Sequence, residues 1–192
     1  MTQRWAAHEF LETQESLRNL VANIELHAHF VEVTEDHELK GVLTRHINRM
    51  MNTYQQGVNM LQSKGQQAPQ LNIQVPRFNV MHQPTIGLQN PSVPAPNPHA
   101  NRLSDVTIST IALNQHKAGS MLAMLWAGEC ADPHLRSYHV MIANNCQEMA
   151  YEIWQYMNHK GYYQAPQLAS HTMNTMIQAF QNQPVAVTSP IM

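Results

Sequence analysis

The chain has 192 residues and a formal net charge of −2, with 11 lysines and arginines against 13 aspartates and glutamates. This length suits a single domain with a proper core, and the balance of charge excludes a basic surface that binds nucleic acid through its phosphates. Only 12% of the residues are charged, against about 25% in an ordinary soluble domain. Such a surface repels its neighbours weakly and therefore suits dense packing.

The first 30 residues predict neither a leader nor a membrane segment. They contain several charged side chains and no apolar core, so we expect no signal peptide and synthesis in the cytoplasm. No stretch of the chain approaches the ~18 apolar residues of a membrane span, so no membrane insertion is expected. The two cysteines, Cys130 and Cys146, are too few for a disulfide framework. We expect both to be reduced, with Cys146 in the core.

The first helix hairpin is expected over residues 5–65. Residues 5–33 contain neither glycine nor proline and predict a long amphipathic helix. Its inward stripe is expected to follow the heptad-spaced apolar residues Phe10, Leu17, Ile24 and Val31. Asp36 is a suitable cap for a second helix over about 37–64, which ends at Lys64 and Gly65.

Residues 66–103 predict an extended linker. Seven of the eleven prolines lie there, and proline removes backbone donors and excludes helix. A connection this long is unusual in a compact domain unless it has a topological purpose. In a bundle that purpose is a crossover, which we expect to let the second hairpin begin at the same end as the first.

A second helix hairpin is expected over residues 104–163. Its first helix, about 104–129, is rich in small residues that permit close helix approach. Asp132 and Pro133 then form a cap and a first-turn proline for a helix over about 133–160, which ends at Gly161. Residues 164–192 are expected to form a C-terminal extension with a short helix.

The two hairpins repeat one another at an offset of 96 residues. Residues 64–71 read KGQQAPQL and residues 160–168 read KGYYQAPQL. The same offset pairs Asp36 with Asp132 and Asn48 with Asn144. Two copies of a helix pair predict a duplicated four-helix bundle, because a solenoid needs about three or more repeats.

The second hairpin resembles the spore coat F family. The resemblance rests on ECADPHLR at residues 129–136 and on MAYEIWQYMNHKGYY at residues 149–163. The family has an acidic residue near the end of its first helix, an Asn/Asp-Pro-x-Leu-Arg turn, and a second helix that ends Met-x-x-x-Gly-Trp-Tyr; Tyr162 stands here in place of the tryptophan. The resemblance covers roughly residues 105–166. It implies a ferritin-like fold and a structural or assembly role in the coat of bacterial endospores, with no known reaction.

A ferritin-like bundle raises the possibility of a di-iron centre. Such centres take one glutamate from each of two helices and a Glu-x-x-His motif from each of the other two. No Glu-x-x-His occurs in this sequence. We therefore expect no di-iron site, no cofactor and no enzymatic activity. Motifs for serine hydrolases, phosphate-binding loops and dinucleotide binding are also absent.

Three of the twelve histidines are expected to point inward. At the offset of 96, His46 aligns with Ile142 and His139 aligns with Leu43, while His27 shares the inward stripe with Leu20. These imidazoles could converge near Glu25 or Glu129, and imidazole suits zinc or copper. The other interpretation is that each is a hydrogen-bonded histidine of the core. Both remain open at the level of sequence.

Tyr162 and Tyr163 also have two interpretations. They either pack under the C-terminal extension or are presented at the bundle end for contact with a partner. Together these features predict an all-α, ferritin-like four-helix bundle that is a non-catalytic structural component of the spore coat. Its expected partners are other spore coat proteins or further copies of itself. The alternative is a bundle that binds a metal ion or small ligand between its inward histidines.

Overall fold

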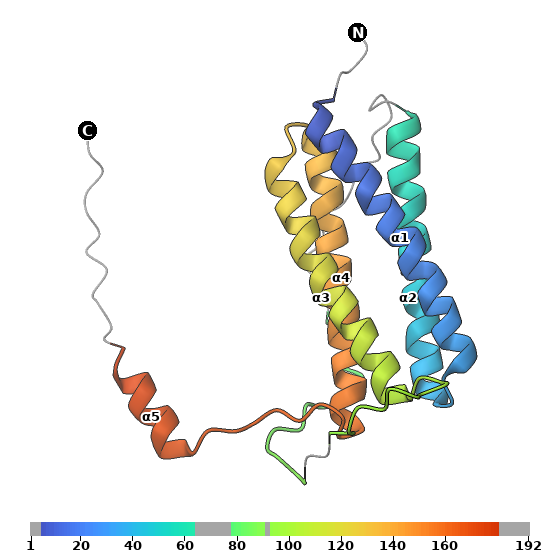
Figure 1. Cartoon of the computed structure of the whole chain (residues 1–192). Coiled ribbons are helices and arrows are strands. Elements are labelled where there is room, and N and C mark those ends of the chain that lie inside the picture. The colour runs from blue at the N-terminus through green and yellow to red at the C-terminus, as the bar shows by residue number, and fades with distance from the viewer. Residues whose placement is uncertain (1–4, 64–77, 91–92, 181–192) are drawn as a thin grey trace, which may run out of the picture.

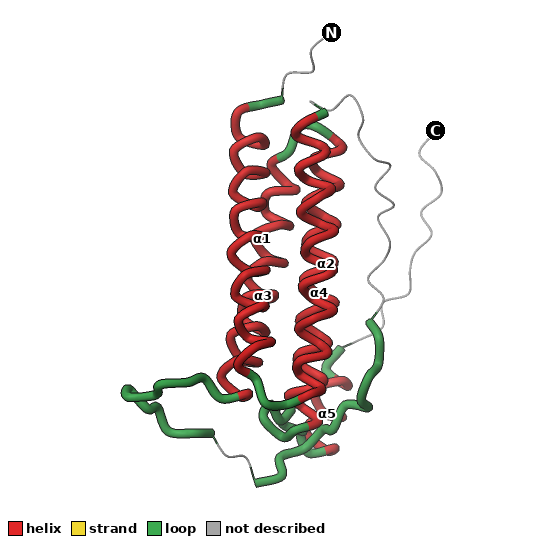
Figure 2. Tube along the Cα trace, turned by 90° about the vertical axis from the view of Figure 1, so that its right-hand side faces the viewer, coloured by secondary structure: helices red, strands yellow, loops and turns green. Residues whose placement is uncertain are grey.

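Four long helices lie side by side in the computed structural model, which describes residues 5–63, 78–90 and 93–180 (Figure 1). They are α1 (Ala7–Val33), α2 (His37–Gln62), α3 (Asp105–Glu129) and α4 (Pro133–His159), and a short α5 (Ser170–Gln178) follows. The four helices run along one common direction in Figure 2, and Figure 1 shows α1 and α3 inclined to α2 and α4. The described residues contain no strand beyond a single bridge between Ile86 and Ala165. The prediction of an all-α bundle is therefore confirmed.

The two hairpins turn at matching positions. Helices α1 and α3 end at Val33 and Glu129, and α2 and α4 begin at His37 and Pro133, each pair 96 residues apart. The caps match as well. Asp36 accepts hydrogen bonds from the backbone amides of the second and third residues after it, and Asp132 does the same in the second hairpin. An aspartate cap satisfies amides that the helix itself cannot pair.

A reciprocal pair of carboxylates joins the hairpins. Glu9, near the start of α1, accepts hydrogen bonds of 2.8 Å from the backbone amides of Ala131 and Asp132 in the α3–α4 turn. Asp105, the first residue of α3, accepts from the Thr34 hydroxyl and, at 3.3 Å, from the Glu35 amide in the α1–α2 turn. Positions 9 and 105 are themselves 96 residues apart. Each hairpin thus caps the turn of the other, as expected of an internal duplication.

The second hairpin begins at the end of the bundle where the first hairpin turns. Asp105 contacts the α1–α2 turn, and α1 starts beside the α3–α4 turn, so α2 and α3 run in the same direction (Figure 1). The expectation that both hairpins begin at the same end is wrong. A second hairpin that began at the same end as the first would need only a short loop, because α2 already returns the chain to the start of α1. A single long crossover is typical of ferritin-like bundles, although the ferritin-like assignment itself stays a prediction.

The buried stripe of α1 differs from the predicted one. The heptad residues Phe10, Leu17, Ile24 and Val31 are only partly buried. The buried residues of α1 are Glu9, Thr13, Ser16, Leu20, His27 and Phe30. The prediction followed apolar side chains alone, whereas the helix turns a polar stripe inward because partners on other helices satisfy it: Glu9 caps a turn, and the Thr13 hydroxyl lies 3.2 Å from His139 Nε2.

Two glycines allow close approach between helices. A Cβ atom at Gly57 in α2 would lie 2.2 Å from the Tyr138 hydroxyl oxygen of α4, and one at Gly119 in α3 would lie 3.0 Å from Cys146 Sγ. Both cysteines are free, as predicted. Cys130 is buried, whereas Cys146, expected in the core, is only partly buried at its edge. Burial raises the pKa of the Cys146 thiol to about 12.

Amide side chains of α4 hold the described part of the connection. The Gln155 side chain accepts from the Met81 backbone amide at 2.8 Å and donates to the Asn79 carbonyl at 2.7 Å. Asn158 bonds both backbone groups of Thr85 in the same way. Residues 64–77 and 91–92 of the predicted linker, and 181–192 of the predicted extension, lie outside the described residues. Helix α5 is drawn apart from the bundle (Figure 1).

Candidate metal centre

Each of the four long helices contributes one polar side chain to a single buried place. His27 comes from α1, His46 from α2, His116 from α3 and Glu152 from α4. The three histidines are between 0% and 3% exposed, and Glu152 is 6% exposed. The arrangement is therefore a polar cluster inside the bundle, enclosed by its own helices.

Three ring nitrogens face one another in this cluster. His116 Nε2 lies 3.3 Å from His27 Nε2 and 3.1 Å from His46 Nδ1. One nitrogen from each ring can be chosen so that all three lie within 4.8 Å of one another. Because the rings come from three helices of both hairpins, only the folded bundle brings these nitrogens together.

The outward-facing nitrogens of two rings have partners that only accept hydrogen bonds. His27 Nδ1 lies 2.8 Å from the Asn23 carbonyl oxygen, and His46 Nε2 lies 3.3 Å from Glu152 Oε2. These nitrogens must therefore carry the ring protons. It follows that His27 Nε2 and His46 Nδ1, which point toward His116, present lone pairs.

Burial keeps the histidines of the cluster neutral. It lowers the pKa of His27 to about 4 and the pKa of His116 well below the ordinary value, and the neighbouring rings add to both effects. Burial also lowers the pKa of His46, and the hydrogen bond to Glu152 opposes this shift without reversing it. Burial by itself would raise the pKa of Glu152, but its contacts with His46, Arg45 and Arg49 outweigh that and lower it. Neutral imidazole beside an ionised carboxylate is the protonation state that metal binding needs.

The structure brings together two of the three histidines predicted from the sequence. His27 and His46 share the cluster, whereas His139 lies near the other end of the bundle, beside Thr13 of α1. Thr13 is fourteen residues before His27, a distance of about 21 Å along a helix. His139 is fully buried, and its Nδ1 has no hydrogen-bond partner among the described residues.

Sequence reasoning missed His116 and Glu152. The signal for His116 was available, because the offset of 96 aligns it with Leu20, an inward-facing residue of α1. Glu152 gave a weaker signal, since its equivalent, Gln56, is a partly buried polar residue.

The two predicted carboxylates lie away from the cluster. Glu25 is exposed, because two residues along a helix turn the side chain to nearly the opposite side from His27. Glu129 is thirteen residues after His116, about 20 Å along α3, and it groups on the surface with His8 and Glu12. A third group, Glu38, His82 and His159, lies where the connection meets α2 and α4, and its two imidazoles stack at 3.8 Å.

Tyr162 and Tyr163 lie at the end of α4 with about 40% of each side chain exposed. Both backbone amides donate to the Met157 carbonyl, and Gly161 has a φ of +75°, so the chain leaves the helix through a glycine cap. Tyr162 meets Tyr156 edge to face, and the Lys117 ammonium lies 5.4 Å from the centre of the Tyr163 ring. The tyrosines therefore pack in part and present their remaining surface to solvent.

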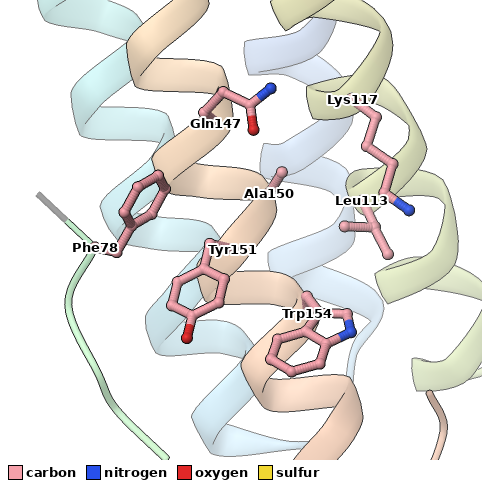
Figure 3. A pocket seen from close by; sticks show the side chains of 7 residues that line it. All are labelled: Phe78, Leu113, Lys117, Gln147, Ala150, Tyr151 and Trp154. Atoms are coloured by element: carbon pink, nitrogen blue, oxygen red, sulfur yellow. The ribbon is translucent and has the colours of Figure 1, made fainter. Parts of the chain in front are cut away.

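A surface pocket lies between α3, α4 and the start of the described connection. Its walls are Leu113, Ala150 and the aromatic rings of Phe78, Tyr151 and Trp154, with Lys117 and Gln147 at the edge (Figure 3). Tyr151 stacks on Trp154 at 5.6 Å and meets Phe78 edge to face at 5.3 Å. A second hollow, which shares Gln147 with the first, is lined by Met121, Met124 and Leu125 of α3 and by residues of α4. The pocket wall is therefore mainly aromatic and aliphatic, with polar groups at its edge.

The second hairpin is similar to a known protein family. The family model described as the Coat F domain matches residues 104–166. The matched range includes both motifs that carry the resemblance, residues 129–136 and 149–163, and the match confirms the resemblance. No curated protein matches the chain.

A solved structure shares the fold. It is a crystal structure described as that of a "putative spore coat protein" from Bacillus halodurans C-125, with a TM-score of 0.60 and 18% sequence identity. The match covers 86% of this chain and 96% of that one. At this identity the likeness shows the fold alone. Among the described helices, none is both long enough and apolar enough to cross a membrane.

Proposed function

Because residues 104–166 match the Coat F domain family, we propose that this chain is a non-catalytic structural component of the bacterial endospore coat. The family match is the observation that carries the proposal. The likeness of the whole bundle to a crystal structure described as that of a "putative spore coat protein" is consistent with it. In this role the chain acts by packing against other coat proteins rather than by transforming a substrate.

The distribution of apolar surface supports the proposal. Four neighbouring apolar side chains of α3 are 43–73% exposed: Met121, Leu122, Met124 and Leu125. Together with the aromatic pocket they form an apolar face on the α3–α4 hairpin, the part of the chain that matches the family. Contiguous exposed apolar surface marks sites of protein–protein contact. We assign this face to contact with other coat proteins.

The low content of charge supports the same role. With 12% charged residues and a net charge of −2, the protein offers little electrostatic repulsion to crowded neighbours. A coat is a dense solid, in which such repulsion would oppose assembly.

Fractionation of spores tests the role. In the bacterium that encodes it, the chain is expected to accumulate only during sporulation and to remain with washed spores until the coat is extracted with detergent and reductant. Constitutive accumulation in growing cells, with none in the coat extract, would overturn the proposal.

A pair of variants tests the apolar face. Replacing Met121 and Leu125 with glutamine removes apolar surface from α3 without adding charge. This variant is expected to fold normally but to be lost from the coat fraction. Leu11→Gln on α1, where the side chain is 61% exposed, is the control and is expected to be retained. Equal retention of both variants would exclude the α3 face as the contact surface.

A further inference from the structure

We propose that His27, His46 and His116 together bind one divalent transition-metal ion inside the bundle, and that zinc fits the site best. The proposal is independent of the coat role, because it rests on the geometry of three side chains and not on the family match. The ion would join α1 and α2 of the first hairpin to α3 of the second.

Two of the three separations between the nitrogens are close to those of a tetrahedral site, and the third is at most 4.8 Å. Bonds of 2.0–2.1 Å from zinc to histidine place two nitrogens of a tetrahedron roughly 3.3–3.4 Å apart. The two measured separations from His116 Nε2 are 3.3 and 3.1 Å. Small movements of the rings would therefore admit the ion. Three protein ligands leave the fourth position to a water molecule or a small anion.

Hydrogen bonding alone does not satisfy the three facing nitrogens. His27 Nε2 and His46 Nδ1 both present lone pairs to His116 Nε2, because their own protons face Asn23 and Glu152. His116 Nε2 carries at most one proton and can donate it fully to one of them. One buried acceptor is then left without a partner, which is costly. A metal ion accepts all three lone pairs at once.

The surroundings of the rings are those of metal-binding histidines. A histidine that binds a metal usually donates its other ring N–H to a carboxylate or a backbone carbonyl, which fixes the ring and raises its basicity. Glu152 serves His46 in this way, and the Asn23 carbonyl serves His27. Arg45 Nη2 lies 3.5 Å from the same Glu152 oxygen, and Arg49 pairs with Glu148 at 2.6 Å.

Imidazole ligands also decide which ions are suitable. Nitrogen ligands favour zinc, copper and nickel over magnesium and calcium, and a tetrahedral arrangement favours zinc over copper(II). Because the rings are at most 3% exposed, the ion is expected to exchange slowly with solvent. The ion is therefore best introduced while the chain folds.

The test is a zinc measurement on the full chain. The protein is unfolded in the presence of EDTA, freed of the chelator, refolded with Zn²⁺, desalted and analysed for metal. About one zinc ion per chain is expected, with slow loss to added EDTA and a melting temperature that rises with the concentration of Zn²⁺. Co²⁺ in place of zinc is expected to give the visible absorption of tetrahedral coordination. A folded chain that retains no zinc would overturn the proposal.

Matched variants locate the site. In His116→Leu one ligand is replaced by leucine, the residue that the first hairpin has at the equivalent position, Leu20. This variant is expected to weaken zinc binding by more than roughly 100-fold. His139→Leu changes another buried histidine outside the cluster in the same manner and is expected to bind zinc normally. Glu152→Gln keeps the ligands but loses the charge behind His46, and a drop of roughly 10–100-fold is expected.

The surface groups provide the competing outcome. If stoichiometric zinc survives in a folded His116→Leu variant but is lost in His82→Gln, the ion binds the group of Glu38, His82 and His159, and the buried site is refuted. If the His116→Leu and His139→Leu variants lose zinc equally, the loss reflects general destabilisation and the proposed ligand set is wrong.

Discussion

Replacing Gly57 with alanine would place a methyl group where a tyrosine already stands. A Cβ atom at this position lies 2.2 Å from the Tyr138 hydroxyl oxygen, 2.7 Å from its ring carbon Cζ and 2.8 Å from a methyl group of Leu17. Tyr138 is fully buried, and its hydroxyl donates a 3.0 Å hydrogen bond to the Thr53 carbonyl. The new methyl group can be accommodated only if the tyrosine moves away from this partner.

The expected cost follows from three contributions. Overpacking of a core costs about 1–3 kcal/mol, and a buried hydroxyl that loses its partner costs about 1–3 kcal/mol. Against these, alanine in place of glycine within a helix stabilises by about 1 kcal/mol. We therefore expect Gly57→Ala to lower the free energy of unfolding by about 1–5 kcal/mol. The matched variant Gly41→Ala, where the nearest atom is the end of Arg45 at 3.7 Å, is expected to raise it by up to ~1 kcal/mol.

Urea denaturation followed by circular dichroism measures both variants under the same conditions. A double variant with Tyr138→Phe adds a direct test, because removal of the hydroxyl relieves the closest contact and is expected to recover part of the loss. If Gly57→Ala proves as stable as Gly41→Ala, α2 and α4 do not approach as the structure describes, and the packing of the hairpins would have to be revised.

Three further predictions concern buried polar groups. Burial lowers the pKa of His139 to about 4 from an ordinary 6.5, so the unfolded chain takes up this proton before the folded chain does as the pH falls, and stability is lost. His139→Leu is therefore expected to reduce the loss of stability between pH 7 and pH 5 by roughly 2 kcal/mol. Identical pH profiles for the two proteins in thermal or urea unfolding would refute this. Glu9→Ala leaves two turn amides without their acceptor and is expected to lower the free energy of unfolding by roughly 2–4 kcal/mol in a urea titration. Glu15→Ala, at an exposed position of the same helix, should change it by less than about 0.5 kcal/mol. Equal effects would show that the Glu9 cap contributes nothing. Burial raises the pKa of Cys130 to about 11 and that of Cys146 to about 12, so a thiol reagent at pH 8 should label the chain only after denaturation. Rapid labelling of the native chain would contradict these raised pKa values.

The helical framework could be predicted because its signals are local. Asp36 and the Asp132–Pro133 pair mark helix starts, and each of these caps hydrogen-bonds its own helix in the structure. The internal repeat then indicated two hairpins of equal design. The direction of the second hairpin could not be read in this way, because it depends on contacts such as that between Asp105 and the α1–α2 turn, which join residues distant in sequence.

The polar interior was only partly predictable, for a physical reason. Apolar periodicity locates a buried stripe when that stripe is apolar, but α1 buries Glu9, Thr13 and His27 through hydrogen bonds to other helices. The alignment of the repeats was the better guide, since it placed His46 and His139 inward. It says nothing about position along the bundle axis, however. For that reason the sequence groups His139 with residues from which it lies about 20 Å away. His116, by contrast, had a signal in the alignment itself, which pairs it with the buried Leu20.

Immunogold electron microscopy of thin-sectioned spores tests most directly whether this chain is built into the spore coat. Antibody raised against the purified bundle is applied to spores of the encoding bacterium and of a strain that lacks the gene. Gold particles concentrated over the coat of the first strain and absent from the second are the predicted result. Particles spread through the spore core, or found equally in growing cells, would contradict the account.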